Sequence, residues 1–219
     1  MKRWKFLRTG YKSDSGNHKW IVGKWYTYDG ELELCERGFH CSKGIYKAFS
    51  YVQGEILALV EVGGKHISSD DKEVWEKMRV VKSYKWIKKD SVLFSIYAAR
   101  LVLKNFEDIY PNDKRPRQAI EAAEKYIKNP SKSNQSSAES AGSAAWSAAE
   151  LARSAESAGS AAESAGSARS AWSAAWSARS ARSAAWSARL TGSAGSAVYK
   201  KLDKWMLNHV KELKLLKEI

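Results

Sequence analysis

Residues 55–62 read Glu-Ile-Leu-Ala-Leu-Val-Glu-Val, with Gly54 before them and the pair Gly63-Gly64 directly after them. An apolar run of this length, bounded by glycines and containing branched side chains, is typical of a buried strand. The two glycines are expected to end it. We therefore predict a buried strand at 55–62 as part of a small sheet.

The segments around this run predict the rest of that sheet. Residues 2–8 alternate Trp4 and Phe6 with charged side chains, the period of a half-buried strand. The further predicted elements are strands at 20–28, 31–36 and 79–86, a type I′ hairpin turn at 28–31, a helix capped by Ser42 and ending at Ser50, and a helix at 70–78.

Two motifs in this region resemble a known family. The first is Trp20-Ile21-Val22-Gly23-Lys24-Trp25-Tyr26. The second runs from Leu34 to Ser42 and ends in Gly38-Phe39-His40-Cys41-Ser42. Both resemble an uncharacterised domain family of phages and prophages, over about residues 4–85. The resemblance implies a phage or prophage origin and brings no activity with it.

A more distant resemblance concerns the order glycine, aromatic, small helix, Ala-x-x-Tyr and apolar strand. This order is similar to the NAD-binding half of ADP-ribosyltransferases of the poly(ADP-ribose) polymerase type. It implies that Tyr51 stacks on a nicotinamide ring. No His-Gly pair and no catalytic glutamate occupy the matching places. The resemblance therefore implies a related fold whose transferase activity is altered or lost.

The middle of the chain is predicted to be helical. Apolar residues recur at helical spacing over 91–109, where Asp90 or Ser91 is the expected cap, and over 114–128, where Asp113 is the expected cap. The segment 110–124 resembles an Ala-rich group of bacterial immunity-like proteins, over about residues 92–190. That resemblance implies an all-helical fold and no catalytic residues.

Residues 133–197 consist largely of Ser-Ala dipeptides at intervals of three or four residues. Alanine favours helix, and small residues let helices approach closely. We expect short helices broken at Gly159, Gly166 and Gly192, folded back so that the acidic first half meets the arginine-rich second half. Residues 198–219 are predicted as a lysine-rich amphipathic helix that docks on the core or forms a homodimer.

Charge and composition exclude several classes. The chain has 37 Lys and Arg against 24 Asp and Glu, and a formal net charge of +13, which favours phosphate-bearing partners. The sequence contains no membrane-span pattern, no signal peptide and no nucleotide-binding glycine loop. Cys35 and Cys41 are spaced too widely for a zinc knuckle, so no metal and no cofactor are predicted, and the expected location is the cytoplasm.

These observations predict an α+β protein with four parts: a small mixed or antiparallel sheet domain at 1–90, a two-helix connector at 91–132, the Ser/Ala helices at 133–197 and the terminal helix at 198–219. The leading hypothesis is a non-enzymatic phage-type accessory protein, with an anti-defence role, that binds a nucleotide signal or a nucleic acid. The alternatives are an ADP-ribosyltransferase-like enzyme and an immunity-type module that binds a host protein through the Ser/Ala helices.

The candidate ligand-binding residues fall into two groups, and no catalytic residue is assigned. In the N-terminal domain the expected pocket residues are Tyr51, His40 and Lys43. In the Ser/Ala region, tryptophans flanked by arginines are expected either to pack in the core or to form a stacking platform. These residues are Trp172, Trp176, Arg169 and Arg179.

Overall fold

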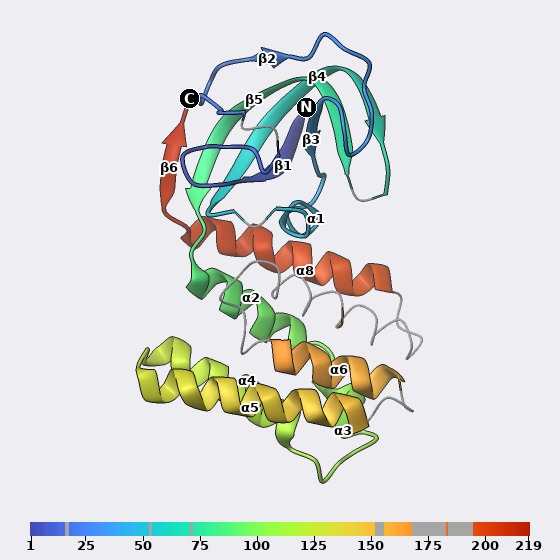
Figure 1. The fold of residues 1–219 in the computed structure, drawn as a ribbon, viewed down its shortest axis with the longest axis vertical. Helices are drawn as coiled ribbons and strands as arrows, with labels where there is room; N and C mark the ends of the chain where they lie inside the picture. The colour runs from blue at the N-terminus through green and yellow to red at the C-terminus, as the bar shows by residue number, and fades with distance from the viewer. Residues whose placement is uncertain (16–17, 53, 71, 152–155, 168–182, 184–194) are drawn as a thin grey trace. The chain divides into compact units, whose positions relative to one another are not determined.

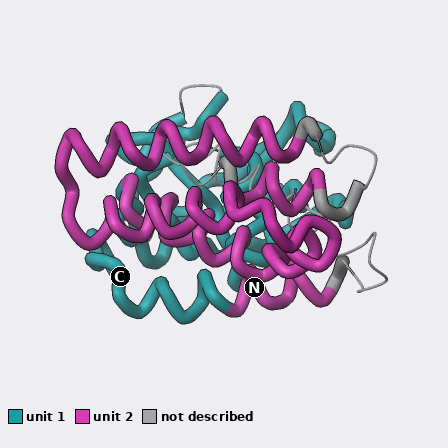
Figure 2. Tube along the Cα trace, turned by 90° about the horizontal axis from the view of Figure 1, so that it is seen from below, with its two compact units in different colours: residues 1–87, 205–219 teal, residues 88–204 magenta. Residues whose placement is uncertain are grey.

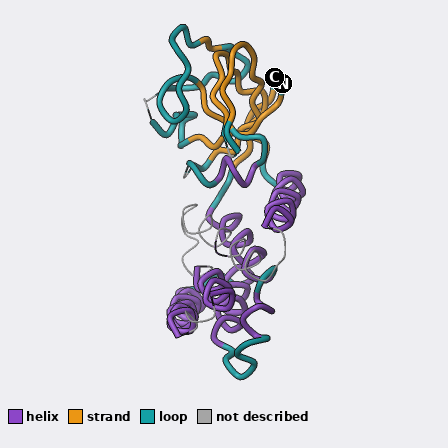
Figure 3. Tube along the Cα trace, turned by 90° about the vertical axis from the view of Figure 1, so that its right-hand side faces the viewer, coloured by secondary structure: helices purple, strands orange, loops and turns teal. Residues whose placement is uncertain are grey.

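The computed structural model describes residues 1–219 except 16–17, 53, 71, 152–155, 168–182 and 184–194. It divides into two compact units (Figure 2). Unit 1 comprises residues 1–87 together with 205–219, and unit 2 comprises residues 88–204. Every strand in the described part of the chain belongs to unit 1, whereas unit 2 is described as helices and loops (Figure 3). The predicted α+β class is therefore confirmed.

Six antiparallel strands form the sheet of unit 1 (Figure 1). Their bounds are β1 (Lys2–Leu7), β2 (Tyr26–Thr27), β3 (Phe39–Cys41), β4 (Ile56–Ser68), β5 (Glu73–Lys85) and β6 (Leu215–Glu218). β4 lies between β1 and β5. The opposite edge of β5 pairs in succession with β3, β2 and β6. The last strand of the sheet is thus supplied by the C-terminal segment.

The structure confirms the strand predicted after Gly54 and the strand predicted at the N-terminus, but it corrects their surroundings. β4 does not end at Gly63-Gly64; it continues to Ser68 through an irregularity in its pairing with β5. Gly64 has a φ of +79°, which suits glycine at that point. The predicted helix at 70–78 is wrong, because residues 73–85 form one strand.

The hairpin predicted at 28–31 is absent from the described residues, and of the strand predicted at 20–28 only β2 forms. The helix after β3 is α1 (Ile45–Phe49), and its N-cap is Gly44 rather than Ser42. Ser42 instead exchanges backbone hydrogen bonds with Trp4. This bridge holds the start of α1 against β1.

The core of unit 1 lies between the sheet and these connections. Buried Val60, Met78 and Val80 belong to one cluster with Trp20 and Leu7. A second contact group is aromatic: the rings of Phe6, Phe49 and Trp86 lie 5.2–5.6 Å apart, centroid to centroid. Edge and tilted contacts of this kind add to the free energy gained by burial.

Unit 2 is built from helices that pack around small buried residues. Their bounds are α2 (Lys88–Arg100), α3 (Leu103–Glu107), α4 (Arg115–Lys128), α5 (Lys132–Leu151) and α6 (Glu156–Ser167). Ile120 and Ala123 of α4 meet Ala165 of α6 in one cluster. Arg117 makes two hydrogen bonds to Glu107, of 2.6 and 2.7 Å, and so joins α4 to α3.

The helices predicted from the sequence are largely present, with different boundaries. The predicted helix at 91–109 is divided into α2 and α3. The cap predicted at Asp113 is wrong, because the N-cap of α4 is Lys114; Asp113 Oδ1 accepts a hydrogen bond of 3.1 Å from the Arg115 amide. The breaks predicted at Gly159 and Gly166 are wrong, because α6 runs through both glycines. Gly192 and the arginine-rich half of the predicted fold-back lie outside the described residues.

The C-terminal segment also differs from the single helix predicted over 198–219. The helix α8 (Gly195–His209) is followed by the short 3-10 helix η2 (Val210–Glu212) and then by β6. The structure assigns residues from Trp205 onward to unit 1, as expected for a segment that docks on a core. No helix in the described part of the chain is both long and apolar enough to cross a membrane.

Candidate functional site

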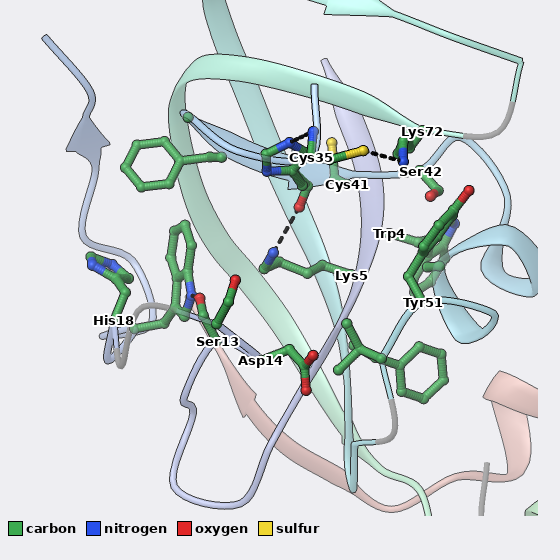
Figure 4. Close-up of a pocket in the computed structure, with 18 of the residues that line it drawn as sticks. Trp4, Lys5, Ser13, Asp14, His18, Cys35, Cys41, Ser42, Tyr51 and Lys72 are labelled. Atoms are coloured by element: carbon green, nitrogen blue, oxygen red, sulfur yellow. Dashed lines mark hydrogen bonds between the residues drawn. The ribbon is translucent and has the colours of Figure 1, made fainter. Parts of the chain in front are cut away.

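A pocket of about 470 Å³ lies in unit 1, beside β1 and β3. It is lined by residues of β1, β3 and α1, by the loops that precede β2 and β3, and by Lys72 just before β5. Figure 4 shows His18 on one side of this space and Tyr51 with Trp4 on the other, with the Lys5 side chain between them. The pocket therefore has aromatic walls and a cationic centre.

Lys5 reaches the pocket from β1. Its Nζ donates a hydrogen bond of 2.7 Å to the carbonyl oxygen of His40 and lies 5.9 Å from the centroid of the Trp20 ring. Burial lowers the pKa of Lys5 below its usual range, although the charge of Asp14 acts in the opposite direction. Among the described residues no carboxylate lies within salt-bridge distance of this ammonium group.

His40 fixes the geometry around Lys5. Besides its carbonyl, its ring Nε2 accepts a hydrogen bond of 2.8 Å from the backbone amide of Cys35. Burial and the nearby charge of Lys5 lower the pKa of His40, so the ring is neutral at pH 7 with its proton on Nδ1. Cys35 has a φ of +74°, an uncommon conformation for a residue other than glycine. His40 thus holds the loop before β3 in place.

Gly38 explains why the loop sequence contains glycine before Phe39. Its φ is +105°, and a Cβ at this position would lie 2.6 Å from Val74 Cγ2. A side chain here would meet both backbone strain and a close contact. The Gly-Phe-His motif is therefore a packing requirement for bringing β3 beside β5.

His18 forms part of one aromatic wall. Its ring lies 4.5–5.8 Å from the rings of Trp20, Tyr26 and Phe39, centroid to centroid. Burial lowers the pKa of His18, and the charges of Lys5 and Lys24 act in the same direction. Its Nε2 is shielded from solvent and forms no hydrogen bond within the part of the chain that is described.

Lys72 supplies a second cation near the other wall. Its Nζ lies 2.7 Å from Cys35 Sγ and 4.8 Å from the centroid of the Tyr51 ring. A cation over an aromatic face is an attractive arrangement. Tyr51 remains 45% exposed, so its ring is accessible from outside the protein.

The structure brings together two of the residues predicted from the sequence and separates a third from them. Tyr51 and His40 line the same pocket. Lys43 is not among the pocket residues; its Nζ lies 3.4 Å from Glu73, on the start of β5. The predicted platform of Trp172, Trp176, Arg169 and Arg179 lies outside the described residues.

Sequence reasoning missed Lys5, Lys72 and the roles of His18 and Trp20 in the pocket. Alternation along residues 2–8 places Lys5 on the other face of the strand from Trp4 and Phe6. This pattern predicts a lysine that faces solvent. In the structure the loop before β2 and the segment after α1 instead lie on either side of Lys5, so that its side chain lines a pocket. A lysine directly between two aromatic residues of a strand was the available signal.

The two cysteines differ strongly in their surroundings. Cys35 is exposed, whereas Cys41 is buried, and burial raises the pKa of the Cys41 thiol to about 12. A protonated buried thiol is a poor nucleophile. Cys41 is therefore unsuited to nucleophilic catalysis. The described residues also contain no cluster of three or more His, Cys, Asp or Glu side chains able to hold a metal ion.

We expect one thiol of the folded chain to react quickly with a disulfide reagent in mildly alkaline buffer, and the other to react only after unfolding. The fast thiol is Cys35, because Cys41 is 5% exposed and protonated. Absorbance of the released thiolate measures both phases. Cys35→Ser removes the fast phase and Cys41→Ser retains it; a fast phase that survives Cys35→Ser contradicts the assignment.

Comparisons with known proteins divide the chain close to the boundary between α2 and the sheet. A family model described as a domain of unknown function (DUF7666) matches residues 1–89. A second model, described as an Imm-5 like putative immunity protein, matches residues 87–213, which is more than half of the chain. No curated protein and no solved structure matches the chain. The immunity-like resemblance predicted over 92–190 is confirmed, whereas phage origin and likeness to ADP-ribosyltransferases stay predictions.

Proposed function

This chain belongs to the Imm-5 like putative immunity protein family, and we propose on that premise that it protects a cell by binding and neutralising a harmful protein without catalysis. The match to that family over residues 87–213 carries the proposal, because these residues include the whole of unit 2. The lack of a nucleophile with a suitable environment at Cys41 agrees with a binding role.

The charges of unit 2 indicate the kind of surface that the partner presents. Four acidic side chains of α3, α4 and their flanking residues are used in ion pairs within the unit: Glu107, Asp108, Asp113 and Glu124. Lys125, Lys128 and Lys132 lie around the turn between α4 and α5, are exposed, and form no ion pair within the described part of the chain. An acidic face on the partner would complement this group.

The proposal is tested by co-expressing the full chain with a panel of bacterial toxin domains, each under an inducible promoter. Growth is expected to recover with a cognate toxin, and the purified pair is expected to form a stoichiometric complex. Lys125→Glu with Lys128→Glu should slow association about 10-fold at low salt, because surface charges steer encounter. Lys77→Glu, in unit 1, is the matched control and should leave the rate unchanged.

Two results would remove this proposal. One is the absence of both rescue and complex formation across the panel. The other is rescue in which the toxin is modified covalently, since that would indicate the enzyme alternative. The anti-defence role and the ADP-ribosyltransferase-like activity remain predictions, and labelled NAD incubated with lysate and the full chain tests the second of them.

A further inference from the structure

We propose that the pocket of unit 1 binds a small molecule in which a flat aromatic ring is joined to a phosphate, with the phosphate on Lys5 and the ring between the aromatic walls. This function is separate from partner binding by unit 2. It is carried by the position of Lys5 and by the unused hydrogen-bonding capacity of His18.

The first argument is electrostatic. The pocket is lined by the cations Lys5, Lys72 and Arg37 and by the acids Asp14 and Glu36. Asp14 is already paired with Arg8, at 2.7 Å. Within the described residues neither Lys5 nor Lys72 has a carboxylate in salt-bridge range. An ammonium group withdrawn from water without a carboxylate in direct contact is costly, and a bound anion offsets that cost.

The second argument concerns the geometry of Lys5. One of its three N–H groups is donated to the His40 carbonyl, which fixes the direction of the side chain. The remaining donors are available on the pocket side, where Figure 4 shows Lys5 between the two walls. A phosphate, with several acceptor oxygens, can use both donors at once. The anion site is thus built before the ligand arrives.

The third argument comes from the walls. Trp20, Phe39 and His18 form one wall, and Trp4 and Tyr51 line the other. Aromatic faces bind flat rings by stacking, whatever the order of polar atoms around the ring. Phosphate alone would make no use of these surfaces. The walls therefore favour a ligand that carries its own ring.

His18 adds a polar imidazole to one wall of the pocket. Its Nε2 is shielded from solvent and has no hydrogen-bond partner among the described residues. Buried polar atoms of proteins are nearly always hydrogen-bonded, so a lone one beside a pocket calls for a partner. A ring amide or amine of the ligand would fill this role. This feature distinguishes the site from a purely apolar cavity.

The volume limits the size of the ligand. A pocket of about 470 Å³ lies at the lower part of the range typical of small-molecule sites. It suits one nucleotide and not a strand of nucleic acid. Among the partners predicted from the sequence, a single nucleotide is thus favoured over a polymer.

The test is calorimetric titration of the full chain with AMP, adenosine and inorganic phosphate at low salt. AMP is expected to bind about 10-fold or more tightly than either half, because both parts of the site are then used. Lys5→Met should weaken AMP binding about 10- to 100-fold and leave adenosine binding nearly unchanged. Lys2→Met, on the same strand and exposed, removes the same charge and should change neither.

His18→Phe is a second variant, which keeps an aromatic ring in the wall. If Lys5→Met alters the circular dichroism spectrum and so perturbs the fold, AMP binding by His18→Phe tests the site instead. His18→Phe should weaken AMP binding about 3- to 10-fold without affecting phosphate. The proposal is overturned if AMP gives no binding heat, or if Lys2→Met and Lys5→Met weaken it equally. It is also overturned if a short oligonucleotide binds more tightly than AMP and is insensitive to Lys5→Met.

Discussion

Replacing Glu73 by alanine is expected to lower the free energy of unfolding by about 3–5 kcal/mol, the range seen when one partner of a buried ion pair is removed. Glu73 is 2% exposed at the start of β5. It accepts hydrogen bonds from Arg3, at 2.5 and 3.2 Å, and from the Trp75 indole at 2.9 Å. Its removal would leave the Arg3 guanidinium and the Trp75 N–H without their acceptor.

The measurement is urea unfolding of the full chain at pH 7, followed by tryptophan fluorescence. Glu61→Ala is the matched control, because Glu61 forms an ion pair of 2.5 Å with Arg79 but both side chains are partly exposed. That pair is expected to contribute only about 0.5–1 kcal/mol. Equal losses in the two variants would contradict the assigned role of Glu73.

The same group predicts how stability depends on pH. Burial by itself raises the pKa of Glu73, but hydrogen bonds from Arg3 and Trp75 outweigh it and lower the pKa to about 2, from an ordinary value of 4.5. A lowered pKa means that the native state favours the carboxylate. The resulting stabilisation of about 3 kcal/mol is complete above pH 4.5 and is lost as the pH falls towards 2.

We therefore expect the difference between wild type and Glu73→Ala to shrink steadily when unfolding is measured between pH 5 and pH 2.5. Glu73→Gln, which keeps the size of the side chain and some of its hydrogen bonds, should show a smaller loss at pH 7. That loss should also shrink over the same interval, because only the wild-type protein carries the ionised group. A difference that stays constant with pH would mean that folding does not lower the pKa of Glu73.

The sequence predicted local elements better than long-range pairings. The strand after Gly54 and the helix after Asp113 are predicted by an apolar run and by the helical spacing of apolar residues, both of which are local signals. Residues 73–78 instead contain glutamate and lysine at spacings compatible with helix. Their conformation depends on burial of Val74, Trp75 and Met78 between β4 and the short strands at the opposite edge. Tertiary packing of this kind overrides local propensity.

The candidate site was predictable only in part for a similar reason. Tyr51 and His40 could be named because they lie in or near recognisable motifs. Lys5 could not, because its role depends on segments that are distant in sequence but close in the fold. His40 is predicted to line a pocket. In the structure it lies in the lining, where its ring accepts a hydrogen bond from Cys35 and its carbonyl orients Lys5.

Unit 1 combines residues from both ends of the chain, and local sequence patterns do not predict this either. Residues 213–219 have an amphipathic spacing that fits a helix, yet residues 215–218 pair with Lys82–Tyr84 of β5. Backbone bonds join Lys85 to Lys214 and Ile219 to Val81, at 2.9 and 3.2 Å. Leu216 packs on the core cluster of the sheet. The predicted N-terminal domain of residues 1–90 therefore omits β6, which is a strand of the same sheet.

Deleting residues 213–219 is accordingly expected to lower the free energy of unfolding of unit 1 by about 3–5 kcal/mol, from several lost backbone hydrogen bonds and from the apolar surface that Leu216 covers. Urea unfolding and hydrogen exchange of the β5 amides measure the effect. Single substitutions locate it: Leu216→Ala should cost about 1–2 kcal/mol, whereas Leu215→Ala, whose side chain is 46% exposed, should cost less than about 0.5 kcal/mol. Equal stability of the deleted and full chains would mean that β6 adds nothing to the sheet, and residues 1–90 would then be a complete domain.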